Sequence, residues 1–515
     1  MKVTLSAERA AASAPALSES VAAHFASRLW AADATLWGPI AESEASIRLG
    51  WVSSPERWRP LAGELETLRQ EFESLGVTRV ILCGMGGSSL APEVMARSSA
   101  ADVRIVDSTH PDELVPLLEG DLSQCVVVVS SKSGGTLETD SQRRVFEQAL
   151  RDQGLDPRER MVIVTDPDSP LHQQAREAGY RVFLGDETIG GRFSALSPFG
   201  LVPAALAGID IGTLLTQATS AHEALSRDEL NNPGLALGAA LAVSHPQRNK
   251  LLLGSFRGLP GLGDWIEQLV AESTGKGGRG LLPVVDSHLS GSADGLVVSG
   301  DLEHSDISVE GTLGEHFLVW EFATAFACQL LGVNPFDQPN VESAKIAAKA
   351  LLDAPATTPR EERDIAGVLV WSNVALPEAV SDIAGLVRQW KELLAPRSYG
   401  AMCVFGDRTL SDRWSDARRA LETELQRPIT LGFGPRFLHS TGQFHKGGPA
   451  EGVFLQIIQT PRDDHDISGR EFTLGTLLAA QAHGDAQVLA DAQLPVMSIT
   501  ASREQLEALW EALGA

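Results

Sequence analysis

Residues 126–139 (VVVVSSKSGGTLET) place hydroxyl groups, glycines and one lysine directly after four valines. The valines have the length and β-branching of a buried parallel strand, and residues 137–150 have the pattern of an amphipathic helix. A turn between a strand and a helix presents backbone N–H groups and the positive end of the helix dipole, which suits a phosphate. The alternative is a capped helix after a tight turn, which Ser and Gly also favour. The number of side-chain donors favours phosphate binding; they are Ser131, Lys132, Ser133 and Thr136.

A second glycine-rich turn, residues 84–90 (GMGGSSL), follows the strand-like run RVILC. Gly86 and Gly87 allow the backbone to turn sharply and to approach a ligand closely, and Ser88 adds a hydroxyl. This turn lacks the lysine of a nucleotide-binding P-loop and the spacing of a dinucleotide fingerprint, and Gly-rich turns are common in α/β folds. Together with the turn at 130–136, however, it predicts a phosphate-sized crevice at the carboxyl edge of a sheet.

A candidate general base lies in residues 264–278 (DWIEQLVAESTGKGG). Gln268 and Glu272 are four residues apart, so they share a face if this segment is helical. Glu272 stands where the helix gives way to a glycine-rich loop, and a carboxylate at such a position can remove a proton from carbon. The alternative is a solvated glutamate at a helix end, which is the more common situation.

Three further segments carry polar groups that could complete a site. Arg192, in GGRFS, is permanently charged and planar, so it suits a developing enediolate, although this motif alone favours a loop salt bridge. Residues 334–345 (NPFDQPNVESAK) include Gln338 and Lys345, and alone they indicate ordinary turn chemistry. Residues 438–448 (LHSTGQFHKGG) gather two histidines, a glutamine and a lysine, and this cluster favours a site.

The composition is that of a globular protein, with 515 residues, 43% apolar and 21% charged. The length predicts about two to four domains. The net charge of −25 argues against nucleic acid or an anionic membrane as a partner. The sequence contains no run of about eighteen apolar residues, so it predicts no membrane span. It also has no hydrophobic signal core near the start, so we expect a cytoplasmic protein. The scattered cysteines predict reduced thiols and no zinc site; they are Cys83, Cys125, Cys328 and Cys403.

Strand-like and helix-like stretches alternate from about residue 77 onward, which predicts an α/β fold with doubly wound parallel sheets. We expect a helical segment at 1–75, a phosphate-binding domain at 76–225, a domain carrying Glu272 at 226–355 and an extra α/β region at 356–515. Residues 355–361 (PATTPRE) have the composition of a linker. The strand-like runs are 79–83, 103–106, 126–129, 161–165, 182–184, 250–256, 282–287, 295–301, 400–405, 429–433, 453–458 and 495–500.

Taken together, the motifs resemble the glucose-6-phosphate isomerase family, which is built on two sugar-isomerase (SIS) type domains. The resemblance runs from about residue 81 to 345 and again around residue 439, and it rests on GMGGSSLAPE, SSKSGGTLET, GGRFS, EQLVAESTGKG, NPFDQPNVESAK and LHSTGQ. It implies that the 131–136 turn binds the substrate phosphate and that Gly86, Gln268 and Gln338 line the sugar site. The catalytic residues that it implies are Glu272 as base, His439 for ring opening, Lys345 near the ring oxygen and Arg192 at the enediolate.

One feature departs from the usual family order. The ring-opening histidine ordinarily precedes the NPFDQ-type segment, whereas LHSTGQ follows it here by about a hundred residues. The region after residue 356 is therefore permuted or extended, and it resembles the isomerase half of fused transaldolase–glucose-6-phosphate isomerase proteins. No transaldolase-like barrel precedes it, so we expect the isomerase alone. His316 and His445 are alternatives to His439.

The resemblance implies an aldose–ketose isomerase of glycolysis and gluconeogenesis, which interconverts glucose 6-phosphate and fructose 6-phosphate through a cis-enediolate. It implies no cofactor and no metal, and a homodimer with shared active sites. Three alternatives stay open: a non-catalytic SIS-type sugar-phosphate sensor, an isomerase that also accepts mannose 6-phosphate through differences near Gln268 and Thr274, and a structural subunit of a larger complex. The pair of Glu272 and Arg192 argues against the sensor, because a sensor needs no base.

Overall fold

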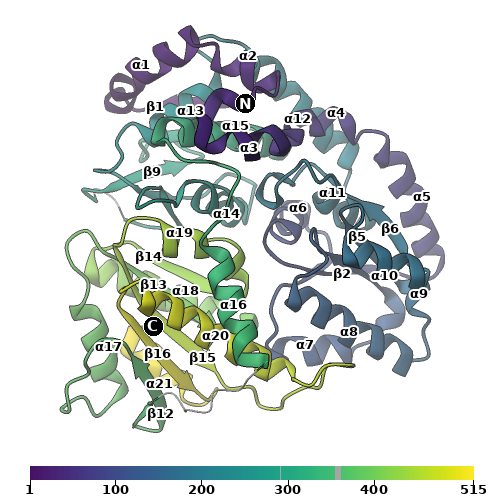
Figure 1. Cartoon of the computed structure of the whole chain (residues 1–515), viewed down its shortest axis with the longest axis vertical. Helices are drawn as coiled ribbons and strands as arrows, with labels where there is room; N and C mark the ends of the chain where they lie inside the picture. The colour runs from purple at the N-terminus through teal and green to yellow at the C-terminus, as the bar shows by residue number, and fades with distance from the viewer. Residues whose placement is uncertain (290–291, 354–360, 515) are drawn as a thin grey trace.

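The computed structural model describes residues 1–289, 292–353 and 361–514, and these form three sheets surrounded by helices (Figure 1). The predicted α/β class is confirmed. The predicted linker lies almost entirely outside the described residues. The sheets fall within 76–225, 226–355 and 356–515 except for one strand from the start of the chain, while the domain boundaries themselves stay a prediction.

The first sheet is parallel throughout, with the strand order β3-β2-β4-β5-β6. Its strands are β2 (Arg79–Gly84), β3 (Val103–Val106), β4 (Cys125–Ser130), β5 (Met161–Thr165) and β6 (Arg181–Leu184). Its helices are α6 (Leu90–Ser99), α7 (Pro111–Leu118), α8 (Leu137–Asp152), α9 (Pro157–Arg160) and α10 (Pro170–Ala178). In β4, Val126 and Val128 pack into one hydrophobic core and Val127 and Val129 into another. Both faces of the strand are therefore covered, as its continuous valine run predicts.

The second sheet has the order β1-β10-β9-β7-β8. Its strands are β1 (Lys2–Leu5), β7 (Lys250–Leu253), β8 (Leu282–Val285), β9 (Gly295–Ser299) and β10 (Ile307–Glu310), and its helices are α14 (Leu262–Thr274) and α15 (Leu313–Leu331). Two strands were not predicted, β1 and β10. They pair antiparallel, with Lys2 opposite Glu310, so the start of the chain is an edge strand of this sheet rather than part of a helical segment.

The remaining N-terminal residues are helical, as predicted, and run over the first two sheets (purple in Figure 1). They form α1 (Ala7–Ala22), α2 (Phe25–Trp30), α3 (Pro39–Arg48), α4 (Ser54–Arg57) and α5 (Leu61–Ser74). A second helical group, α11 (Pro198–Leu206), α12 (Ile211–Leu225) and α13 (Pro233–Ala242), joins the two sheets. Buried side chains of both groups belong to the same core as one face of each sheet, so these parts are packed as one body.

The third sheet has the order β11-β12-β16-β15-β13-β14. Its strands are β11 (Arg363–Ile365), β12 (Val368–Ser372), β13 (Tyr399–Phe405), β14 (Ile429–Phe433), β15 (Gly452–Gln459) and β16 (Val496–Ala501). Its helices are α17 (Ile383–Glu392), α18 (Ser411–Leu425), α19 (Gly442–Gly447), α20 (Leu474–Asp491) and α21 (Leu506–Leu513). The four predicted strands pair in parallel, and the two that were not predicted, β11 and β12, add an antiparallel edge.

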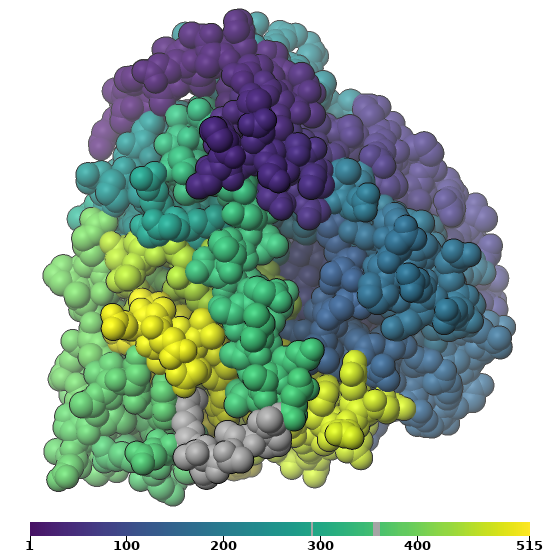
Figure 2. All heavy atoms as spheres, viewed as in Figure 1, coloured from purple at the N-terminus to yellow at the C-terminus, as the bar shows by residue number. Residues whose placement is uncertain are grey.

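Helix α16 (Val341–Asp353) connects the second sheet to the third and packs along α20. In the space-filling view it runs down the middle of the face, between the third-sheet region and the first-sheet region (Figure 2). This position brings the residues of the 334–345 segment toward the carboxyl edge of the first sheet.

Candidate active site

A cavity of about 610 Å³ lies at the carboxyl edge of the first sheet. Elements from all parts of the chain line it: the turns after β2 and β4, the C-terminal half of α14, the start of α16 and the short helix η7 (Arg436–His439). Every residue of the predicted site lines this cavity, namely Gly86, Gly87, Ser88, Ser131, Lys132, Ser133, Thr136, Arg192, Gln268, Glu272, Gln338, Lys345 and His439.

The two glycine-rich turns leave the sheet side by side, because Gly84 of β2 pairs in register with Ser130 of β4. Gly86 has a φ of +56°, and a Cβ there would lie 2.8 Å from Gln268 Nε2. A Cβ on Gly87 would overlap the carbonyl oxygen of Gly191. Glycine is therefore required at both positions by backbone conformation and close approach.

The turn after β4 ends in the N-terminus of α8, whose N-cap residue Thr136 makes no side-chain capping bond. The first four N–H groups of a helix have no partner within the helix, and they carry the positive end of its dipole. The hydroxyls of Ser131 and Thr136 lie 3.4 Å apart beside these groups. This is an anion-binding arrangement of the predicted kind.

The charge of Lys132 is already partnered in the structure. Its ammonium forms an ion pair with Asp166 and donates to the carbonyl oxygen of Asp186 at 2.8 Å. Burial lowers the pKa of Lys132, with the charge of Asp166 opposing that effect. Lys132 still lines the cavity, and its contact with a phosphate stays a prediction.

Glu272 lies in the last turn of α14, with Gln268 one turn before it. Gln268 Nε2 donates to Glu272 Oε2 at 3.2 Å and to the carbonyl oxygen of His439 at 2.8 Å. Arg192 Nη1 pairs with Glu272 Oε1 at 2.9 Å. The carboxylate is thereby held in one orientation at the cavity wall.

The guanidinium of Arg192 is fixed by neighbours on the 334–345 segment. It donates to the carbonyl oxygens of Pro335 and Asp337, both at 2.8 Å, and to Gln338 Oε1 at 3.3 Å. The side chain is 3% exposed. A planar cation held at several points keeps its position while charge develops on a bound molecule, so no reorganisation is required.

His439 comes from η7, after the third-sheet strand β14, and its Nε2 lies 2.8 Å from Glu138 Oε1. Burial alone would raise the pKa of Glu138, but the charge and the hydrogen bond of His439 hold it below its ordinary value. Lys345 on α16 adds to this effect. Glu138 is therefore an ionised partner of the imidazole, and it leaves the other ring nitrogen, Nδ1, for proton transfer.

The chain is similar in sequence to known glucose-6-phosphate isomerases over more than half of its length. A probable glucose-6-phosphate isomerase of Haloquadratum walsbyi is 30% identical over 344 residues, which cover 53% of this chain and 79% of that protein. The chain belongs to the glucose-6-phosphate isomerase family. The glucose-6-phosphate isomerase of Synechococcus sp. (strain JA-3-3Ab) is 30% identical over 390 residues, covering 60% of this chain and 73% of that enzyme. No protein-family model matches the chain.

Among solved structures, a glucose-6-phosphate isomerase from Chlamydia trachomatis superposes with a TM-score of 0.50 at 21% sequence identity. The match covers 65% of this chain and 79% of that one, and at this level of identity it concerns the fold alone. The family assignment explains why motifs far apart in the sequence converge on one cavity.

His439 lies in this isomerase-family site although it comes late in the chain. The third-sheet region folds back so that η7 of the same chain reaches the carboxyl edge of the first sheet. Arg436, at the start of η7, anchors it with ion pairs to Glu93 and Asp107, both at 2.6 Å. All the predicted site residues therefore meet within one chain.

The two alternative histidines lie elsewhere. His316 on α15 is 1% exposed, and burial lowers its pKa to about 4. His445 is 5% exposed, its Nδ1 bonds to the Tyr399 hydroxyl at 2.8 Å, and burial lowers its pKa to about 3. Neither lines the cavity. Thr274, considered for substrate preference, is also buried away from it, with its hydroxyl bonded to the Val270 carbonyl at 2.8 Å.

Several residues of the site were missed by sequence reasoning. Glu138 lies inside the quoted SSKSGGTLET motif, two residues after the last predicted phosphate ligand, so a buried acidic residue in the first turn of α8 was the available signal. Asp166, the partner of Lys132, follows β5 at the same sheet edge, which strand order could have indicated. Asp337, which also lines the cavity, lies inside the quoted NPFDQPNVESAK motif, whereas Glu44 and Arg48 have no comparable local signal.

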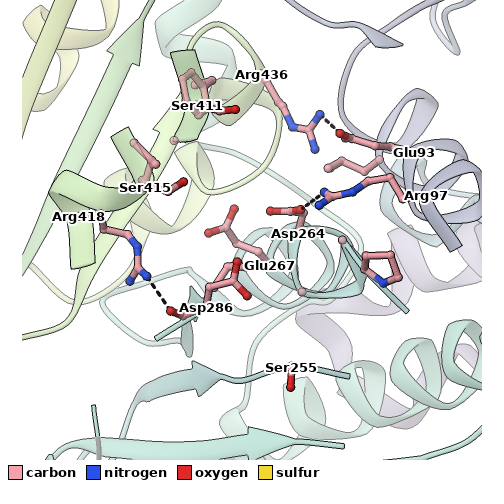
Figure 3. A pocket seen from close by; sticks show the side chains of 18 of the residues that line it. Glu93, Arg97, Ser255, Asp264, Glu267, Asp286, Ser411, Ser415, Arg418 and Arg436 are labelled. Carbon is pink, nitrogen blue, oxygen red and sulfur yellow. Dashed lines mark hydrogen bonds and ion pairs between the residues drawn. The ribbon is translucent and has the colours of Figure 1, made fainter. Parts of the chain in front are cut away.

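A larger cavity, of about 990 Å³, lies against the opposite face of α14 and contains none of the predicted site residues (Figure 3). Asp264 and Glu267 of α14 point into it, whereas Glu272 lines the smaller cavity. Its arginines bond to neighbouring groups: Arg436 pairs with Glu93 at 2.6 Å, and Arg418 donates to the Asp286 carbonyl at 2.6 Å. The smaller cavity is the candidate active site because all the predicted site residues line it and none of them lines the larger one. Within the described residues, no helix is both long and apolar enough to cross a membrane.

Proposed function

We propose that this chain catalyses the reversible interconversion of glucose 6-phosphate and fructose 6-phosphate. The observation that carries the proposal is the pairing of Glu272 with Arg192 at 2.9 Å in the cavity that also contains the uncapped N-terminus of α8. A carbon acid needs a base beside the carbon and a positive charge beside the oxygen of the intermediate, and a sugar phosphate needs an anion site several atoms away. The family membership supports the same reaction.

In this proposal the phosphate binds at the N-terminus of α8 and at the hydroxyls of Ser131, Ser133 and Thr136. This anchor is remote from the reacting carbons, so its binding energy positions C1 and C2 for reaction. Gly86, Gly87 and Ser88 form the neighbouring wall, and Gln268 and Gln338 meet the sugar. Lys132 supports the turn through Asp166 and contributes its charge at longer range.

His439 and Lys345 would open the ring by moving a proton between the C1 hydroxyl and the ring oxygen. Glu272 would then remove the proton from C2, giving a cis-enediolate whose negative charge Arg192 stabilises. Return of that proton to C1, with transfer of the hydroxyl proton from O2 to O1, completes the ketose. The carbonyl moves from C1 to C2 with no net oxidation.

We propose further that a single chain supplies the complete catalytic set. The homodimer expected from the family resemblance then requires no exchange of His439 between subunits. This part is supported by the presence of Glu272 and His439 of one chain in one cavity, linked through Gln268. The cytoplasmic location expected from the sequence belongs to the same proposal.

The test is conversion of fructose 6-phosphate to glucose 6-phosphate by the purified chain, followed through a coupled dehydrogenase. Mannose 6-phosphate and unphosphorylated fructose serve as comparison substrates. Turnover of fructose 6-phosphate to glucose 6-phosphate, with little turnover of mannose 6-phosphate or of unphosphorylated fructose, supports the proposal. Sugar-phosphate binding without turnover would favour the sensor, and equal turnover of mannose 6-phosphate would favour the broader isomerase.

A further inference from the structure

The buried carboxylate of Glu138 shares one oxygen between two donors. Its Oε1 lies 2.8 Å from His439 Nε2 and accepts a hydrogen bond from Gln481 Nε2 at 2.7 Å. Glu138 is 6% exposed and Gln481 5% exposed, so water competes little with either bond. Glu138 Oε1 therefore interacts with the imidazole of His439 and with the side-chain amide of Gln481, which lies in the third-sheet region.

The amide of Gln481 has a fixed orientation. Thr109, which follows β3 and is fully buried, donates its hydroxyl to Gln481 Oε1 at 3.3 Å. A hydroxyl donor on the oxygen end directs the NH₂ end of the amide toward Glu138. Thr109, Gln481, Glu138 and His439 thus form one hydrogen-bonded chain that joins α20, the first sheet and η7.

Gln481 reaches the imidazole only through Glu138. Besides Glu138 on α8, which bonds the imidazole, the charged groups that share the cavity with His439 come from several elements. They are Glu44 and Arg48 on α3, Lys132 after β4, Asp166 after β5, Arg192 on η5 (Gly191–Phe193), Glu272 on α14, Asp337 before α16, and Glu342 and Lys345 on α16. Within the described contacts, only Glu138 bonds the imidazole itself. A change at Gln481 therefore alters the strength of one specific bond and leaves the other charges in place.

We propose that Gln481 is a positioning residue of the isomerase site, which holds Glu138 and thereby sets the basicity of His439. The catalytic role of Gln481 rests on the proposed function. Its effect on the pKa of His439 can be measured whether or not the protein is an isomerase. A neutral N–H donor withdraws negative charge from the carboxylate oxygen that the imidazole also uses. Removal of this donor strengthens the attraction between Glu138 and protonated His439, so the pKa of His439 rises by about half a unit to one unit.

The experiment is an NMR titration of the imidazole nitrogens in the full-length protein. The His439 signals are identified by their loss in His439→Gln. Gln481→Met removes the amide at nearly constant volume, and Gln487→Met is the matched control, because Gln487 lies exposed on the same helix and bonds Asp491. In Gln481→Met we expect a higher pKa of His439 and an equal shift, toward higher pH, of the acid limb of the kcat/KM–pH profile. In Gln487→Met we expect neither to change.

A pKa of His439 in Gln481→Met within about 0.2 units of the wild-type value would overturn the inference. If that variant does not fold, Thr109→Val replaces it, since loss of the orienting hydroxyl predicts a smaller shift in the same direction, and no shift there would overturn it equally. An inactive wild type would refute the proposed function while the imidazole titration still tests the positioning role.

Discussion

The role of Arg192 can be tested by separating its catalytic and structural contributions. The variant Arg192→Met keeps an unbranched side chain but removes every donor. In the structure those donors satisfy the carbonyl oxygens of Pro335 and Asp337, the amide oxygen of Gln338 and the carboxylate of Glu272. The substitution therefore leaves three neutral acceptors and one carboxylate without this partner.

The size of each effect follows from these contacts. Each neutral acceptor left without a donor costs about 1 kcal/mol, the lower end of the usual range, because the cavity admits water. For three acceptors we expect the free energy of unfolding to fall by about 3 kcal/mol. Loss of one preorganised donor at a developing oxyanion predicts a fall in kcat of about 10²- to 10³-fold. Arg192→Lys keeps one charge near Glu272 but cannot donate to separated carbonyl oxygens as a fork, so we expect an intermediate kcat.

The assay is steady-state turnover of fructose 6-phosphate together with the midpoint of thermal unfolding and the affinity for the substrate. We expect a large fall in kcat with nearly unchanged substrate affinity at a temperature where all variants are folded. A variant Arg192→Met that is less stable but retains kcat within about tenfold would refute the reasoning, because Arg192 would then only hold the 334–345 segment.

Three further predictions follow from particular contacts. Gly87→Ala places a Cβ against the Gly191 carbonyl oxygen, so we expect at least a tenfold loss of kcat/KM in a folded protein, and near-normal kinetics would contradict the close approach. Burial lowers the pKa of His445 from 6.5 to about 3, so between these values the unfolded chain binds more protons and stability falls as the pH falls. From pH 7.5 to 5 this histidine alone costs about 2 kcal/mol of unfolding free energy, and His445→Gln should lose that share of the acid sensitivity; an unchanged pH dependence of the thermal midpoint would contradict this. Co-expressed, differently tagged Glu272→Gln and His439→Ala chains should stay inactive when they are purified together through both tags, whereas about half of the wild-type activity in that heterodimer would show that sites are shared.

Local sequence was sufficient for the elements whose pattern is self-contained. The valine run of β4, the start of α8 at Leu137 and the face shared by Gln268 and Glu272 were predictable because each depends on neighbours in the chain. The convergence of the motifs on one cavity followed from parallel-strand geometry and the family resemblance.

The missed features depend on partners far apart in the sequence. Strand β1 is four residues long and is stabilised by β10, about three hundred residues later, so neither segment carries a strong signal by itself. The ion pair of Lys132 depends on Asp166 at the end of the next strand, which was not predicted, while the binding of phosphate by Lys132 stays a prediction. The contribution of Gln481 depends on the packing of α20 against the first-sheet region, which no local pattern indicates.

The most direct test of the account is turnover by Glu272→Gln beside the matched control Glu267→Gln. Both glutamates lie on α14, but Glu267 points into the larger cavity on the opposite face (Figure 3). We predict that Glu272→Gln still binds fructose 6-phosphate and loses at least about 10²-fold in kcat, as expected for removal of a general base, while Glu267→Gln stays within about twofold of wild type. Near-normal turnover in Glu272→Gln, or an equal loss in both variants, would contradict the assignment of Glu272 as the base.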